Sequence, residues 1–112
     1  RSRAALASAG QSTGRRMFEA MVAGGAQAAG RGVGGIAEGS WGDLLALDGR
    51  AVDLQGREGD AVLDAYIFAG DDRMVSRVWA AGRPVVEGGR HVKHAEIRDR
   101  YAATLAKLSA AL

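Results

Sequence analysis

The chain has 112 residues, no cysteine, and 15 basic against 13 acidic side chains, for a formal net charge of +2. The length fits one modest domain or part of a larger one, and the lack of cysteine excludes disulfides and thiolate metal sites. Because both signs of charge are interspersed, the composition argues against nucleic-acid binding, which needs clustered basic residues. The densest basic group is expected to be a solvated helix face: Arg1, Arg3, Arg15 and Arg16.

We expect a first helix over about residues 13–30, with Ser12 or Thr13 as its N-cap. Its apolar side chains recur at helical spacing: Met17, Phe18, Met21, Val22, Ala26 and Ala29. Gly24 and Gly25 interrupt this pattern at a cost of about 1 kcal/mol each, which predicts close approach to a neighbouring element. Gly30 should end the helix as a C-terminal cap.

A glycine-rich loop leads into a short apolar run at 43–48, which predicts a buried strand. Residues 49–59 are polar and predict a loop. Asp60 is expected to cap a brief helix that stops at Gly70. The alternation over 73–79 predicts another strand.

Gly82 is expected to form a turn into a returning strand at Val85–Val86, and a second turn leads to His91. Pro84 cannot donate a ladder hydrogen bond and therefore predicts an edge strand. A last helix is expected over 95–112, with apolar residues at helical spacing: Ile97, Tyr101, Leu105, Leu108 and Leu112. The order of elements indicates an α/β fold. Few large side chains point inward (5% of residues are aromatic and 17 are glycine), so these short strands predict a poor independent core.

Residues 30–35 satisfy the G-x-G-x-x-G pattern, with Asp53 further along the chain. A dinucleotide fingerprint follows a strand and opens a helix, so that the helix N-terminus receives the pyrophosphate. Here the glycines follow a predicted helix and precede a predicted strand. The order is wrong, and we predict no cofactor-binding residue.

The remaining chemical candidates also have ordinary structural interpretations. His91 and His94 are three residues apart, and Glu96 or Asp99 is a candidate for a further metal ligand. Zinc, however, needs three or four ligands. We therefore interpret the histidines as surface residues. The pair Asp71–Asp72 suits a turn, and the two tryptophans suit packing: Trp41 and Trp79. No catalytic, cofactor-binding or metal-ligating residue is predicted.

Several segments together resemble the C-terminal end of the amidohydrolase superfamily. These segments are 25–30, with a Gly-Ala-x-x-Ala-Gly pattern, 34–39, 42–48, 75–79, and then 82–83, 85–86 and Gly89. Gly42 stands where alanine is usual. Further stretches are similar to the formimidoylglutamate deiminases: 14–20, 63–70, and 89–91 together with 95–97.

The resemblance implies a C-terminal piece of a (β/α)8 metallo-dependent hydrolase: residues 1–32 would end the barrel region, 33–94 would belong to a composite β-sandwich, and 95–112 would be the C-terminal helix. It also implies zinc bound upstream, where a zinc-activated hydroxide would attack the formimino carbon of N-formimino-L-glutamate. Its partners would be the N-terminal remainder of the same enzyme, a small-molecule substrate and a second copy in a homodimer, with no nucleic acid and no membrane. A cytoplasmic location is expected. Two alternatives stay open: another deaminase of the superfamily (imidazolonepropionase, guanine deaminase or chlorohydrolase-like), or a non-enzymatic interaction module.

Overall fold

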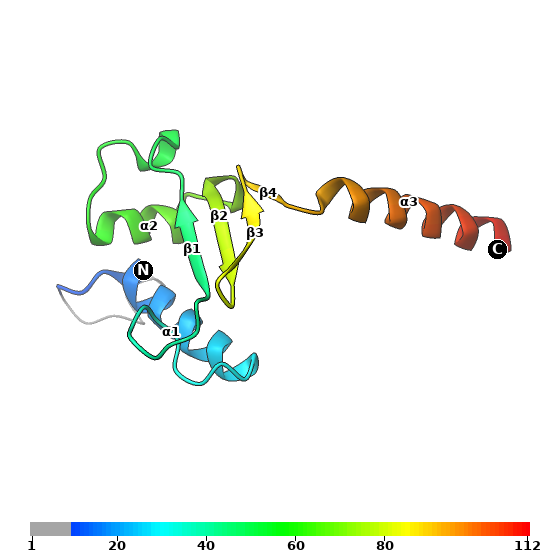
Figure 1. Cartoon of the computed structure of the whole chain (residues 1–112). Helices are drawn as coiled ribbons and strands as arrows, with labels where there is room; N and C mark the ends of the chain where they lie inside the picture. The colour runs from blue at the N-terminus through cyan, green and yellow to red at the C-terminus, as the bar shows by residue number, and fades with distance from the viewer. Residues whose placement is uncertain (1–9) are drawn as a thin grey trace.

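The computed structural model describes residues 10–112. It contains three helices, α1 (Thr13–Ala28), α2 (Asp60–Phe68) and α3 (His94–Ala111). It also contains four strands, β1 (Leu44–Leu47), β2 (Val75–Ala80), β3 (Arg83–Glu87) and β4 (Arg90–His91). In Figure 1, α1 and α2 lie on the β1 side of the sheet, whereas α3 extends away from the β4 side. The arrangement is α/β, as predicted.

The first helix is close to its prediction. Ser12 is the N-cap, and its hydroxyl accepts a hydrogen bond from the Arg15 amide. At the other end Gly30 takes a φ of +70°, which a side chain would disfavour. The Arg31 amide then donates to the Ala26 carbonyl at 2.8 Å, so the last turn of α1 is closed. Gly30 therefore acts as the predicted cap.

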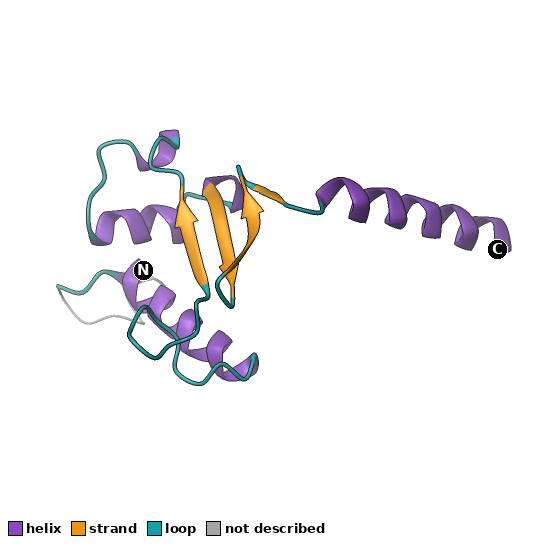
Figure 2. Ribbon diagram, viewed as in Figure 1, coloured by secondary structure: helices purple, strands orange, loops and turns teal. Residues whose placement is uncertain are grey.

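The four strands form one antiparallel sheet in the order β1-β2-β3-β4 (Figure 2). Leu45 pairs with Val78 in the β1–β2 ladder. Ala81 and Gly82 both have positive φ and form the two-residue turn between β2 and β3. A second turn of this kind follows β3, so both predicted turns are confirmed.

The hydrophobic core is small and includes one residue of α2. Only Leu54, Ala65 and Met74 among the described hydrophobic residues are buried, with partly buried neighbours around them: Leu47, Ala51, Val62 and Tyr66. Leu54 belongs to a single 3₁₀ turn at Val52–Leu54. The prediction of an unstructured loop over 49–59 was therefore incomplete, because it gave no weight to one leucine that anchors the loop in the core.

Several sequence-based details were wrong. The N-cap of α2 is Gly59, and Asp60 occupies the first helical turn instead. The strand starting near residue 73 begins at Val75, after a 3₁₀ turn at Asp72–Met74. The first two residues of β1 are exposed, so the strand predicted to be buried is covered at one end only.

Two further expectations need correction. A β-carbon added to Gly24 or Gly25 would have no described atom within 4 Å, so nothing in residues 10–112 makes the close approach predicted there. Pro84 lies on β3, which has β2 on one side and β4 on the other. However, β4 pairs only with Val86 and Glu87. The half of β3 that contains Pro84 is thus a local edge, because β4 is too short to reach it.

Candidate functional site

An apolar groove runs between α1, the glycine-rich loop after it, and β2. It encloses about 440 Å³ and is lined mainly by apolar side chains, among them Met21, Val22, Ala26, Val33, Trp41 and Val78. Gly34 brings the loop against α1, since a β-carbon there would lie 2.7 Å from Val22 Cγ1. The glycine-rich segment therefore serves close packing against a helix.

Arg31 contacts two other residues that line this groove. It follows the C-terminal cap of α1, and its guanidinium lies over the Trp41 ring, 3.9 Å from the ring centroid. The Nε atom is 3.1 Å from Asp43 Oδ2. A guanidinium satisfied by a carboxylate and an aromatic face in this way links the end of α1 to the start of β1.

Asp43 has a second partner across the groove. Its Oδ1 accepts a hydrogen bond from the Ala81 amide at 2.8 Å. Next to it, the Gly42 carbonyl accepts from the Gly82 amide at 2.8 Å. A β-carbon on Gly42 would lie 2.9 Å from the Gly82 nitrogen, so the contact suits glycine at this position. Sequence reasoning took Asp43 only as a charge bounding a strand, whereas it joins α1, β1 and the β2–β3 turn.

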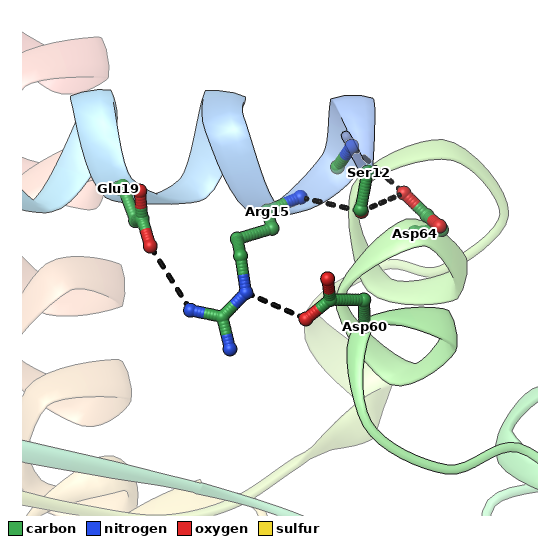
Figure 3. A network of polar contacts seen from close by, with 6 residues as sticks. Ser12, Arg15, Glu19, Asp60 and Asp64 are labelled. Atoms are coloured by element: carbon green, nitrogen blue, oxygen red, sulfur yellow. Dashed lines mark hydrogen bonds and ion pairs between the residues drawn. The ribbon is translucent and has the colours of Figure 1, made fainter. Parts of the chain in front are cut away.

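A polar network joins α1 to α2 (Figure 3). Asp64 Oδ1 accepts two hydrogen bonds, from the Ser12 hydroxyl and from the Gly14 amide, each 2.7 Å long. The carboxylate therefore lies at the N-terminus of α1, where free amides and the helix dipole favour a negative charge. Gly14 is buried, and a β-carbon there would collide with both the side chain and the backbone of Asp64. Only glycine allows α2 to approach α1 this closely.

Arg15 extends the same network on the exposed side. Its Nε is 2.5 Å from Asp60 Oδ1, and its Nη1 is 2.9 Å from Glu19 Oε1. These carboxylates, Asp60 above all, raise the pKa of Arg15 above its ordinary value. Arg15 and Arg16 are exposed, which agrees with the predicted solvated face; Arg1 and Arg3 lie outside the described residues. Phe18 adds an edge-on contact with Tyr66, 6.5 Å between ring centroids.

Much of the apolar surface near the groove is uncovered in the described part of the chain. Val33 is 87% exposed and Ile36 is 89% exposed. Trp41, Leu44 and Leu45 are also exposed. Exposed apolar side chains that gather in a large patch are common at interaction sites. The groove and these five side chains together form what we call the assembly surface.

The residues weighed for chemistry do not come together. His91 and His94 are exposed, and His91 Nδ1 accepts a hydrogen bond from the Lys93 amide at 3.0 Å. No three His, Asp or Glu side chains within residues 10–112 are placed to hold a metal ion. The G-x-G-x-x-G segment lies between α1 and β1, so it opens no helix.

The other candidates are structural. Asp71 caps the turn at Asp72–Met74, and its hydrogen bonds with Arg73 lower the pKa of Asp71. Trp79 lies 5.1 Å from the Arg77 guanidinium, measured to the ring centroid. Among residues 10–112, no helix has both the length and the hydropathy to cross a membrane. The feature that stands out in the described residues is therefore the apolar groove, with the exposed apolar side chains beside it.

Comparison with solved structures shows which class of protein the chain is similar to. A crystal structure of an amidohydrolase from Brucella melitensis matches 92% of this chain, with a TM-score of 0.78 and 39% sequence identity. The similarity in both fold and sequence confirms the resemblance to amidohydrolases inferred from the motifs. No model of a protein family matches the chain.

A curated relative narrows this class. Formimidoylglutamate deiminase of Pseudomonas aeruginosa is 51% identical to this chain over 78 residues, which is 70% of the chain. This confirms that the chain resembles that deiminase. The chain spans 17% of the length of this relative and 22% of the length of the solved amidohydrolase. Both comparisons therefore match a short segment to part of a much larger enzyme.

Proposed function

We propose that this chain is the C-terminal segment of a zinc-dependent amidohydrolase that hydrolyses N-formimino-L-glutamate in histidine degradation. In that reaction water adds to the formimino C=N group, the carbon–nitrogen bond breaks, and N-formylglutamate and ammonia are released. The observation that carries the proposal is the 51% identity with formimidoylglutamate deiminase over 78 residues. Identity at this level over 70% of the chain favours this enzyme over other members of the superfamily.

The described residues do not fit a zinc site. They offer two exposed histidines and no cluster of three ligating side chains, whereas catalytic zinc takes three protein ligands and a water. The proposal therefore assigns the zinc ligands and the catalytic groups to the remainder of the polypeptide.

The role we propose for this segment is structural. Residues 1–32 would end the barrel region, 33–94 would form part of a small β-sandwich, and 95–112 would be the terminal helix. The support is the large total area that the chain exposes for its mass. The chain exposes 8646 Å², whereas a compact protein of 11.6 kDa exposes about 5,800 Å². A radius of gyration of 17.8 Å against about 13 Å for a compact domain of this length agrees with this.

The substrate is tested by an assay on the complete polypeptide. Purified enzyme incubated with N-formimino-L-glutamate should release ammonia, with guanine and imidazolone propionate as competing substrates. Turnover of guanine or of the imidazolone alone would identify one of the other deaminases and would refute the assignment. A cytoplasmic location and the lack of nucleic-acid binding are further predictions of the proposal.

The structural role is tested by splitting the enzyme. The remainder of the polypeptide and residues 1–112 are produced separately and mixed. We expect ammonia release only from the mixture. Leu45→Asp, on the assembly surface, should abolish this recovery, whereas Arg50→Asp, at an exposed loop position, should leave it intact. Recovery with both variants would show that the assembly surface does not bind the remainder.

The non-enzymatic alternative gives a different result with residues 1–112 alone. An independent module should unfold cooperatively, stay monomeric and bind no ANS, a dye that fluoresces on exposed apolar surface. The proposed segment should bind ANS through its uncovered groove. Cooperative unfolding without dye binding would favour the interaction module.

A further inference from the structure

The start of α1 is held in place by one carboxylate of α2. The Ser12 hydroxyl and the Gly14 amide each donate a hydrogen bond of 2.7 Å to Asp64 Oδ1 (Figure 3). Ser12 is also the N-cap of α1, and its hydroxyl oxygen accepts a hydrogen bond from the Arg15 amide at 3.0 Å. A single oxygen of Asp64 therefore binds both the capping residue and the first turn of the helix.

Close packing leaves this junction little room to move. Within the described residues, Gly14 is the only buried residue of α1, and a β-carbon on it would lie 2.6 Å from the Asp64 α-carbon. Further along α1, the Phe18 ring meets the Tyr66 ring edge-on. The helix α2 is itself anchored, because its Ala65 belongs to the hydrophobic core. The first turn of α1 is thus fixed against an element that the core holds in place.

A second carboxylate of α2 offers a comparison. Asp60 lies one helical turn before Asp64, and its Oδ1 binds the side chain of Arg15 instead of the backbone of α1. Both partners of this ion pair are about half exposed, and solvent weakens such pairs. The hold on the first turn of α1 therefore comes chiefly from Asp64.

The proposed function places this turn in the complete enzyme. The present inference rests on that proposal, in which residues 1–32 end a (β/α)8 barrel. In such a barrel each strand is followed by a helix, and the loops from strand to helix form the face at which active sites lie, here called the catalytic face. The N-terminus of a barrel helix lies at the same face. Ser12 and Gly14 would therefore stand where the chain enters α1 from the catalytic face.

We propose that Asp64 is a positioning residue for the reaction. By binding Ser12 and Gly14 it fixes the first turn of α1, and through that turn it fixes the strand-to-helix loop that leads into α1. Asp64 acts through the backbone of α1 and takes no part in the chemistry. A displacement of about 1 Å in a group that orients substrate can cost about 100-fold in rate, so a residue that only sets the position of a loop can affect turnover.

The experiment measures steady-state ammonia release by the complete polypeptide. Asp64→Ala should raise KM at least about ten-fold, because the displaced loop no longer holds substrate in one geometry. Loss of folded enzyme would lower the apparent kcat and leave KM unchanged, so a change in KM separates positioning from stability. Asp64→Asn keeps an oxygen that accepts both hydrogen bonds and loses only the charge at the helix terminus, so its KM should stay within about two-fold of wild type.

Two further variants complete the test. Asp60→Ala is the matched control, since it makes the same change one turn earlier on α2 and removes only the exposed pair with Arg15. Its KM should stay within about two-fold of wild type. Ser12→Ala removes one of the two bonds to Asp64 and should raise KM about five-fold, the equivalent of one hydrogen bond. It decides the question if the Asp64→Ala protein does not fold.

Each outcome decides the proposal. A wild-type KM in Asp64→Ala overturns it, and so does an equal rise in KM in Asp64→Asn or Asp60→Ala. If Asp64→Ala does not fold, a wild-type KM in Ser12→Ala overturns it. The KM is measured with whichever of the three competing substrates the wild-type enzyme hydrolyses. Turnover of guanine or of the imidazolone would therefore refute the proposed substrate while leaving the test of Asp64 intact.

Discussion

Replacing Asp64 should loosen the junction between α1 and α2. One oxygen, Oδ1, accepts both the Ser12 hydroxyl and the Gly14 amide hydrogen bonds. Asp64→Ala removes this acceptor, and the Gly14 amide is left buried beside α2. At about 1 kcal/mol for each bond, the loss is about 2 kcal/mol, or about 30-fold in the equilibrium for opening the first turn of α1.

Asp64→Asn separates hydrogen bonding from charge. The amide oxygen of asparagine can accept both bonds, so this variant loses only the negative charge at the N-terminus of α1. That charge stabilises the helix terminus by about 0.5 kcal/mol, so its loss should change the opening equilibrium about two-fold. The alanine substitution should therefore raise the equilibrium constant for opening the first turn of α1 about ten-fold more than the asparagine substitution does.

The assay is hydrogen exchange of the complete polypeptide, followed by mass spectrometry of a peptide covering residues 12–20. Asp99→Asn, at an exposed position on α3, is the control and should leave exchange in that peptide unchanged. Equal protection in wild-type and Asp64→Ala protein would refute the reasoning, because it would mean that the two bonds do not hold the junction closed.

Two further predictions concern packing and charge. Gly34→Ala should lower the free energy of unfolding by about 1–3 kcal/mol, because the added methyl group meets Val22. The loss is measured as a lower unfolding temperature. Gly24→Ala, with no described atom within 4 Å of the added carbon, should stabilise α1 by up to about 1 kcal/mol, read as slower hydrogen exchange in that helix; equal losses of stability from both changes would contradict this packing. Arg73→Ala should raise the pKa of Asp71, measured by NMR titration of its carboxyl carbon. Arg73 lowers that pKa below its ordinary 3.8. The ion pair therefore stabilises the turn above about pH 4, and this stabilisation is lost as the pH falls through the folded-state pKa of Asp71. An Asp71 titration that the substitution leaves unchanged would show that the ion pair with Arg73 does not form.

Local patterns predicted most of the elements. The cap at Ser12, the end of α1 at Gly30 and both hairpin turns follow from short-range chemistry, namely hydroxyl capping and positive φ at glycine. Where a longer-range partner competes, sequence reasoning failed. Asp60 looks like a cap, but in the structure its carboxylate binds Arg15, which is 45 residues away. Leu54 lies in a polar segment, and only the position of α2 shows that it is a core residue.

The features of the candidate site also separate into those that sequence could predict and those that depend on folding. The resemblance to amidohydrolases was available from motifs, and so was the expectation that this segment carries no catalytic residue, which stays a prediction. The roles of Asp43, Asp64 and Gly14 were not available, because each depends on a contact between elements far apart in the chain. A carboxylate in sequence shows only its charge; the backbone amides it accepts from are brought to it by folding.

The order of helices and strands and the glycine turns could be predicted from local sequence. So could the scarcity of large apolar side chains, from which we predict that the chain depends on other polypeptide. The location of the uncovered apolar surface could be seen only in the folded chain. Folding placed the groove beside α1 and β1 and directed α3 away from both. The physical reason is that periodicity identifies an apolar face, whereas packing decides whether the chain itself covers that face or leaves it for a partner.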